Sequence, residues 1–269
     1  MSERDDYFAN PALNYSLINH GRKSMRHMRY MATHPQKTTA AMSMGTILHA
    51  AILEPDDFFR RVAIWDKGDK QGGAWKEFQA EHADGYILKQ DEHANVMRAA
   101  ANVHADSMAR QLIEQTVHEQ EFYWRGDQYG DAKARMDGVN NAGTVLLEVK
   151  STASIDERKW QWHAVDFGLH LQLGWYAEGI EAKTGHAPDQ VWWIVFEQKG
   201  CCDAVTYEVP QGVVNKGREA AVEIARRYRA CQMTGSFPGA AEGQVRTFAL
   251  PDWMMEDGDK VDFGEGAGE

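Results

Sequence analysis

The sequence predicts an α/β fold in which a mixed central sheet is flanked by helices, and three observations support this prediction. The chain has 269 residues, which is enough to bury a hydrophobic core without disulfide or metal cross-links. Apolar residues follow a helical period over most of the first half, and the period changes to that of strands at about residue 117. Helical and strand-like stretches then alternate to about residue 233, which is typical of an α/β domain.

The individual elements follow from these patterns in chain order. Before the change of period, the apolar spacing predicts helices over residues 15–30, 38–53, 75–82 and 91–114. After it, alternating or apolar runs predict strands over 117–125, 131–139 and 144–150, and Asn-Asn-Ala-Gly at 140–143 predicts a hairpin turn. The remaining pattern predicts helices over 155–166 and 169–183, strands over 191–198 and 203–209, and a helix over 213–233.

These elements are expected to form one domain, residues 1–249. No internal repeat and no Pro-rich or Ser-rich linker divides it. Residues 250–269 are acidic and glycine-rich, and this composition predicts a flexible, solubilising tail.

Composition indicates a cytoplasmic protein with no membrane partner. Hydrophobic residues make up 43% and charged residues 26% of the chain. The longest apolar run, residues 191–196, is too short to span a membrane, and the N-terminus is polar and acidic. Three cysteines form neither a zinc motif nor a disulfide framework. The net charge of −11 argues against nonspecific coating of nucleic acid.

The predicted hairpin carries residues suited to metal-dependent chemistry. Because side chains alternate along a strand, Asp137 on one strand and Glu148 and Lys150 on the other can meet on one side of the sheet. Two carboxylates with the carbonyl of Val149 form an oxygen-rich site suited to Mg²⁺, for which Mn²⁺ can substitute. A lysine beside the ion can hold the attacking water and stabilise charge on a phosphate. The hairpin is therefore equipped for phosphodiester hydrolysis.

The Glu-x-Lys pattern alone does not decide this. It occurs at four places, Glu148/Lys150, Glu157/Lys159, Glu181/Lys183 and Glu197/Lys199. The first of these is preceded by an aspartate on a hairpin partner strand. The alternative interpretation, a solvated charged edge of an antiparallel sheet, stays open on these residues alone.

Lys133-Ala-Arg-Met-Asp137-Gly, followed by Thr144-Val-Leu-Leu-Glu148-Val-Lys150, resembles the core motif of the PD-(D/E)XK nuclease superfamily. More narrowly, the chain resembles the RecE-like (exonuclease VIII-type) exonucleases of phages and prophages. Three further segments carry this resemblance: Met44-Gly45-x₃-His49-x₃-Leu53-Glu54-Pro55, Trp75-Lys76-Glu77-Phe78, and Gln172-x₃-Tyr176. The chain departs from the superfamily pattern in having Met136 in place of the proline before the aspartate.

The resemblance implies a restriction-endonuclease-like fold and a role for each matching residue. Asp137, Glu148 and Lys150 become the catalytic residues, and His49, Asp137, Glu148 and the Val149 carbonyl become the metal ligands. Gln172 and Tyr176 support the site or contact the DNA backbone. The alternative to a ligand role for His49 is that of a buried, hydrogen-bonded core histidine. Glu121, on the strand before that of Asp137, is a weaker candidate for a further acidic metal ligand.

The activity implied by the resemblance is 5′→3′ digestion of double-stranded DNA ends to mononucleotides in a bacterial host cell. The implied context is phage-type homologous recombination with a single-strand annealing protein, and the implied assembly is a ring-shaped homo-oligomer of three or four subunits. The alternatives are another PD-(D/E)XK deoxyribonuclease, either an endonuclease or a 3′-acting enzyme, and a catalytically inactive relative that binds DNA ends.

Basic residues are candidates for contacts to the DNA backbone. Residues 7–53 contain no acid, and Arg22, Arg26 and Arg29 are spaced to share a helix face. Lys133 and Arg135 are expected beside Asp137 on its strand. The alternative for the three arginines is a solvated basic face.

Overall fold

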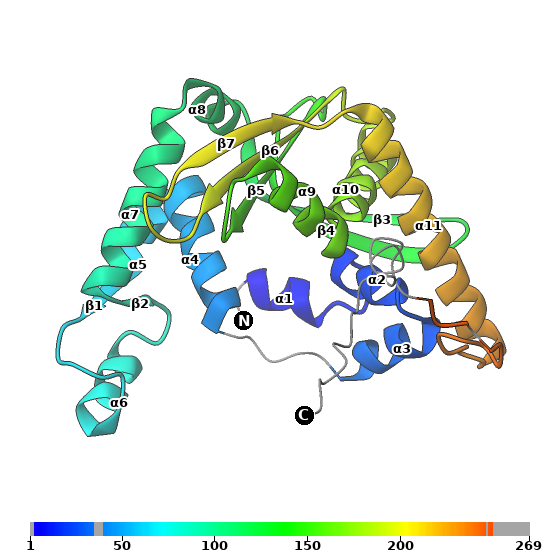
Figure 1. The fold of residues 1–269 in the computed structure, drawn as a ribbon, viewed down its shortest axis with the longest axis horizontal. Helices are drawn as coiled ribbons and strands as arrows, with labels where there is room; N and C mark the ends of the chain where they lie inside the picture. Colours follow the sequence, from blue (N-terminus) through cyan, green and yellow to red (C-terminus); the bar gives the residue numbers. More distant parts are fainter. Residues whose placement is uncertain (1–2, 35–39, 246, 250–269) are drawn as a thin grey trace, which may run out of the picture.

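A mixed five-stranded sheet forms the centre of the computed structural model, which describes residues 3–34, 40–245 and 247–249. The strands follow the order β3 (Val117–Gly126), β4 (Gly130–Val139), β5 (Val145–Thr152), β6 (Gln190–Glu197) and β7 (Ala204–Glu208). Neighbouring strands are antiparallel except β5 and β6, which are parallel. The predicted α/β fold with a mixed sheet flanked by helices is confirmed (Figure 1).

Helices cover both faces of this sheet. One core cluster joins the sheet to α2 (Tyr15–Gly21), α3 (Met25–Thr33), α9 (Glu157–Asp166), α10 (Leu169–Thr184) and α11 (Gln211–Thr234). The other joins it to α4 (Ala40–Leu53), α5 (Pro55–Arg61), α7 (Gln90–Ala105) and α8 (Ser107–Glu114). Apolar residues of β5 enter both clusters, since Leu146 belongs to the first and Val145, Leu147 and Val149 to the second. The central strands β5 and β6 are therefore buried on both faces, which explains their continuous apolar runs.

Two expected helices are each divided. The expected helix over 15–30 ends at Gly21, and α3 starts after Ser24, whose side chain accepts a hydrogen bond from the backbone of His27. The expected helix over 91–114 is interrupted at Asp106, whose carboxylate caps α8 through the amide of Ala109. Serine and aspartate are strong N-cap residues because their oxygens satisfy free amides at a helix start.

Several short elements were not predicted. These are α1 (Glu3–Ala9), α5, and a small parallel sheet of β1 (Val62–Trp65) and β2 (Tyr86–Lys89) that brackets α6 (Gly72–Glu81). Each of the two strands has four residues, too few for a clear alternation pattern. The expected tail, residues 250–269, lies outside the described residues. Within the described ranges, no helix is long and apolar enough to cross a membrane.

Candidate active site

The hairpin strands β4 and β5 separate at the predicted catalytic residues. They pair only at Gly138–Leu147 and Val139–Leu146. Beyond these pairs, two carboxylates bridge the opening. The backbone amide of Val149 donates to Asp137 Oδ2 at 2.7 Å, and the amide of Asp137 donates to Glu148 Oε1 at 3.2 Å. Each carboxylate thus takes a place that a ladder hydrogen bond would otherwise fill, and both are fixed in position by the opposite strand.

Lys150 completes this fork between the strands. Its Nζ lies 2.6 Å from Glu148 Oε2 and 3.6 Å from Asp137 Oδ2. The structure therefore brings together the three residues expected from the alternation pattern.

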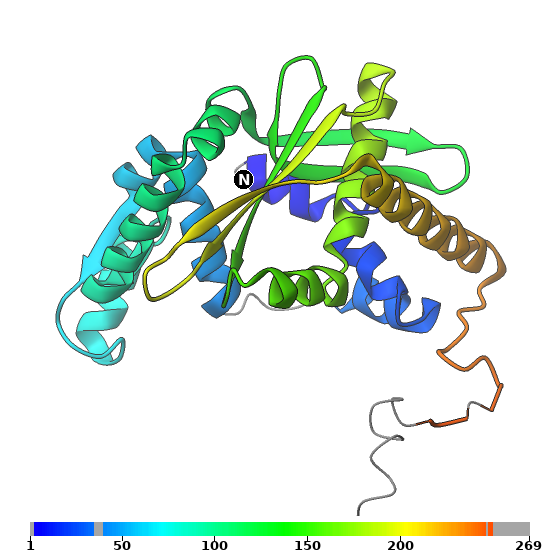
Figure 2. The same ribbon diagram turned by 45° about the horizontal axis from the view of Figure 1, so that its top comes forward.

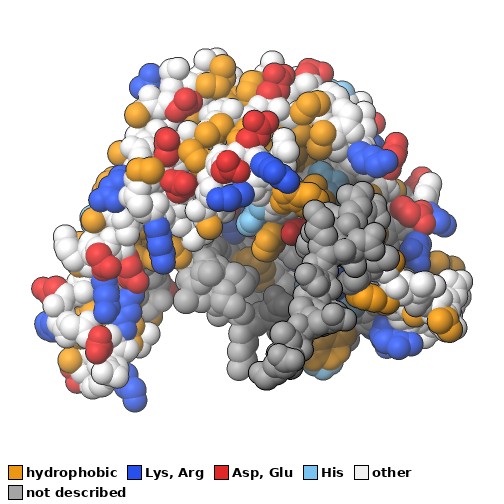
Figure 3. All heavy atoms as spheres, viewed as in Figure 1, with side chains coloured by type: hydrophobic (Ala, Val, Ile, Leu, Met, Phe, Trp, Pro, Cys, Tyr) orange, Lys and Arg blue, Asp and Glu red, His pale blue; other side chains and the backbone are white. Residues whose placement is uncertain are grey.

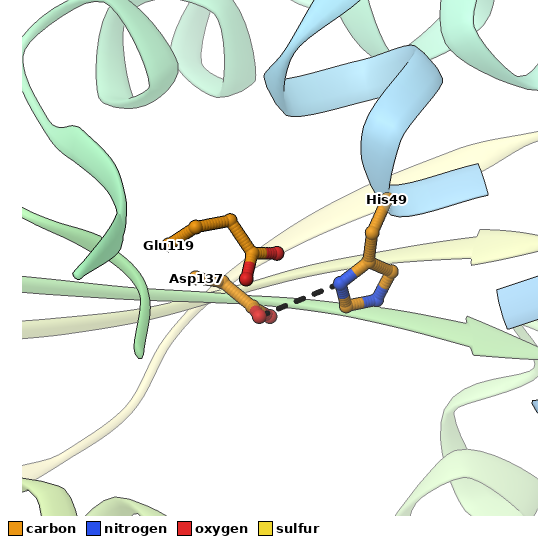
Figure 4. A group of neighbouring side chains, drawn as sticks. All are labelled: His49, Glu119 and Asp137. Atoms are coloured by element: carbon orange, nitrogen blue, oxygen red, sulfur yellow. Dashed lines mark ion pairs between the residues drawn. The ribbon is translucent and has the colours of Figure 1, made fainter. Parts of the chain in front are cut away.

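His49 and Glu119 approach Asp137 from two other elements. His49 extends from α4, and its Nδ1 lies 3.4 Å from Asp137 Oδ1. Glu119 lies on β3 between His118 and Gln120, which pair with Gly138 and Met136 of β4, and it has a positive φ of 53° that is rare for a residue with a side chain. Possible ligand atoms of His49, Glu119 and Asp137 all lie within 4.8 Å of one another (Figure 4).

This donor set fits a divalent cation. An imidazole nitrogen and two carboxylate oxygens are acceptable ligands for Mn²⁺ and Mg²⁺. Glu148 is not part of this group, since its two oxygens are bonded to the amide of Asp137 and to Lys150. The roles of Glu148 and of the Val149 carbonyl as ligands stay predictions.

Electrostatics in the fork show strong coupling between its groups. Burial disfavours charge on Asp137, but His49 and Lys150 hold the pKa of its carboxyl well below the usual value. Burial, followed by the charge of Asp137, raises the pKa of Glu148 and also that of Glu119. A cation among these carboxylates would relieve the repulsion that keeps both values high.

Gln172 and Tyr176 lie behind the fork on α10. The amide of Gln172 donates to the Tyr176 hydroxyl at 2.9 Å. Burial, and then the nearby charge of Glu148, raise the pKa of Tyr176 well above its ordinary value. Tyr176 is buried and Gln172 is half-buried. Their support of the fork and their contact with DNA stay predictions.

Glu121, the weaker candidate ligand, does not join the metal group. Its carboxylate accepts a hydrogen bond from the Tyr123 hydroxyl at 2.8 Å. The acid that reaches Asp137 is Glu119, which sequence reasoning missed. The register of β3 against β4 is the signal that separates the two acids, because Glu121 pairs with Arg135, two residues away from Asp137.

Lys133 is not placed to contact DNA, which corrects the prediction. Only 2% of its surface is exposed. Its ammonium donates to the backbone carbonyls of Tyr7 and Asn10 and lies 4.4 Å from the centre of the Tyr7 ring. Alternation along β4 is as expected, but α1 covers the side chain. Lys133 therefore anchors the N-terminal segment.

The arginines also differ from expectation. Arg22 follows α2 instead of sharing a helix with Arg26 and Arg29, and its guanidinium donates to the carbonyls of Val165 and Asp166 at 2.9 Å each. Arg26 and Arg29 are exposed on α3 and remain candidates for contact with DNA.

Arg135 lines a pocket of about 170 Å³ beside the metal group. Its Nε lies 2.5 Å from Glu119 Oε2. His49 and Glu119 also line this pocket. Arg135 is therefore placed to orient a candidate ligand, and its contact with phosphate stays a prediction.

A mixed sheet whose forked hairpin holds an Asp and a Glu-x-Lys pair beside a group of candidate metal ligands is typical of the PD-(D/E)XK nuclease superfamily. The chain belongs to the PDDEXK-like domain family of unknown function DUF3799, whose model matches residues 21–245.

A solved structure shows the same fold. A "Putative exonuclease" from Eubacterium rectale superposes with a TM-score of 0.63 at 13% identity, covering 96% of this chain and 98% of its own. A phage related exonuclease from Haemophilus somnus gives a TM-score of 0.33 at 10% identity, covering 81% of this chain and 94% of its own. No match was found among curated proteins.

Proposed function

We propose that this protein is a RecE-like exonuclease that digests double-stranded DNA from its 5′ ends to mononucleotides with the help of Mg²⁺ or Mn²⁺. The observation that carries the proposal is the convergence of His49, Glu119 and Asp137 beside Lys150. A group of two acids and a histidine with an adjacent ammonium matches the needs of phosphodiester hydrolysis.

Each residue has a role in this chemistry. His49, Glu119 and Asp137 would hold the cation, and Glu148 with the Val149 carbonyl would complete its coordination. The bound cation would lower the pKa of a coordinated water and offset charge on the phosphate. Lys150, held between two carboxylates, orients that water and places a positive charge where negative charge develops.

The finer features of the proposal have separate support. The solved structure that shares the fold is named a putative exonuclease. The 5′→3′ direction, the role in recombination and a single-strand annealing partner rest on the RecE-like motifs around His49 and Gln172. A ring of three or four subunits would concentrate Arg26 and Arg29 around DNA while the excess acids of a chain with net charge −11 face outward.

Linear duplexes labelled at the 5′ or the 3′ end, compared with closed circular DNA, test this function. In Mn²⁺ or Mg²⁺ we expect early release of the 5′ label as mononucleotide, intact circles, and no hydrolysis in a chelator. Lys150→Ala should lose most of the rate and still bind metal, whereas Asp137→Asn should lose both.

Other outcomes assign the alternatives. Cleavage of closed circles identifies an endonuclease, and early release of the 3′ label identifies a 3′-acting enzyme. Binding of duplex ends without hydrolysis in any divalent cation identifies an inactive relative. Each of these results contradicts the proposed 5′→3′ activity.

A further inference from the structure

Strand β7 ends the five-stranded sheet and pairs with β6 alone. Asp203 and Val209 flank β7: the carbonyl of Asp203 accepts from the amide of Glu197, and the amide of Val209 donates to the carbonyl of Val191. The alternation of an antiparallel ladder therefore turns the amides and carbonyls of Thr206 and Glu208 outward. Among the described residues, these outward backbone groups have no hydrogen-bond partner. An open edge of this kind is a template for an added strand.

An apolar groove runs beside this open edge. It has a volume of about 460 Å³ and lies between α9, β7 and the start of α11. Trp160, Val165, Tyr207 and Val213 line it, and Val165 and Val213 are 53% and 38% exposed. Two acids, Glu157 and Glu208, lie among these apolar side chains. Figure 3 shows hydrophobic and acidic side chains together on the surface over β7 and α9.

A segment of the same chain has the chemistry that this surface requires. Val245 and Phe248 are 98% and 86% exposed, and Figure 2 shows the chain after α11 running away from the sheet. The sequence Val245-Arg-Thr-Phe-Ala-Leu250 is rich in strand-forming residues and ends before a proline. In a strand, Arg246 and Phe248 would project from one face, which suits an apolar groove with acids beside it.

Residues 245–250 cannot pair along the length of β7 in their own subunit. Gln244 lies in one pocket with Arg227, whereas the groove lies at Val213, near the start of α11. Arg227 lies fourteen positions after Val213 in α11, which is about 21 Å along the axis. For residues 245–250 to pair with β7, Val245 would have to lie at one end of that strand. Val245 directly follows Gln244, which lies near Arg227 and away from β7. The strand must therefore come from another copy.

We propose that residues 245–250 of one copy add as a sixth strand to β7 of a second copy, with Phe248 in the groove. The two contacting surfaces differ, so the contact is heterologous and can close into a ring when the rotation between copies allows it. This inference goes beyond the proposed nuclease function and does not depend on it.

A labelled peptide tests the contact directly. Fluorescence anisotropy should show saturable binding of a peptide of residues 243–252 to the full chain carrying Phe248→Asp, which cannot supply its own segment. Phe248→Asp in the peptide, or Val165→Asp in the protein, should weaken binding at least about tenfold, because a buried aromatic anchor dominates such contacts. Met108→Asp, at an equally helical and exposed apolar position on α8, should leave binding unchanged. Absence of saturable binding, or equal binding to the Val165→Asp protein, overturns the proposal.

Cross-linking between copies tests the arrangement in the assembled protein. With Cys201→Ser as background, a chain carrying Phe248→Cys is mixed with a chain of different tag length carrying Val213→Cys and oxidised with copper phenanthroline. A disulfide between the two different chains is expected, and Met233→Cys in place of Val213→Cys should give none. In light scattering, Phe248→Asp should reduce an oligomer to single chains of 30.4 kDa. A wild-type protein that is a single chain, or a disulfide no more frequent than with Met233→Cys, contradicts the contact.

Discussion

Asp137 is the residue on which the site depends, because it contacts all the other elements of the site. Its carboxylate accepts a hydrogen bond from the Val149 amide, lies near His49 and Lys150, and forms the group of candidate ligands with His49 and Glu119. The alternation of the hairpin predicts Asp137, Glu148 and Lys150, since this pattern depends only on neighbouring residues. Glu119 could not be separated from Glu121 in this way, because the two acids are two residues apart and an alternating strand gives them the same face.

Neutralising Glu119 should distinguish these two acids. Glu119→Gln removes a candidate ligand charge beside Asp137, so Mn²⁺ affinity measured by calorimetry should fall at least about tenfold, as for loss of one charged metal ligand. Glu121→Gln is the matched control on the same strand, and its affinity should stay within about twofold of the wild type. Equal losses in the two variants would exclude Glu119 as the specific ligand.

At the scale of elements, close contacts between segments distant in sequence determine where some helices end and which side chains are buried. A local sequence pattern does not show these contacts. The order and boundaries of the main strands and helices are predictable because each has a clear period. The division of residues 15–30 depends on one serine cap, and the burial of Lys133 depends on Tyr7 of α1, which is more than a hundred residues away in sequence. Helices α10 and α11 cross closely at Gly174 and Gly217. A Cβ added to Gly217 would lie 1.8 Å from the carbonyl oxygen of His170, so that this crossing has no room for a side chain there.

The helix crossing predicts a large effect of one methyl group. Gly217→Ala would force the backbones of α10 and α11 apart, and we expect the free energy of unfolding in urea to fall by about 3 kcal/mol or more. Gly212→Ala in the same helix meets nothing within 4 Å, and should change stability by less than about 1 kcal/mol. Similar stability of the two variants would argue against the close crossing.

The anchor at Lys133 predicts a structural effect and not a DNA-binding effect. Lys133→Met keeps the length of the side chain but removes its hydrogen bonds to Tyr7 of α1 and to Asn10 after it, and should lower the free energy of unfolding by about 2–3 kcal/mol. Cleavage within the first twelve residues by a protease should become faster. Lys183→Met removes an exposed lysine that lies over the Phe122 ring, and should cost less than about 1 kcal/mol. A Lys133→Met protein with wild-type stability and weaker DNA binding would restore the original prediction.

For the whole molecule, the fold and the metal site are coupled because the candidate ligands come from three separate elements. His49 lies on α4, Glu119 on β3 and Asp137 on β4, so a cation bound by all three joins a helix of one core cluster to the sheet. An unfolded chain cannot bring these residues together. A bound cation should therefore stabilise the folded state in proportion to its occupancy.

This linkage predicts a metal-dependent melting temperature. At a Mn²⁺ concentration about 100 times the dissociation constant, binding to the folded state contributes about 2.7 kcal/mol. For a chain of this size, Tm measured by calorimetry should rise by about 5–10 °C over its value in a chelator. Asp137→Asn should abolish the rise, whereas Glu121→Gln should retain it, because Glu121 lies outside the metal group. A rise of the same size in Asp137→Asn would show that Mn²⁺ stabilises the protein from another site, and the proposed coordination by His49, Glu119 and Asp137 would then be wrong.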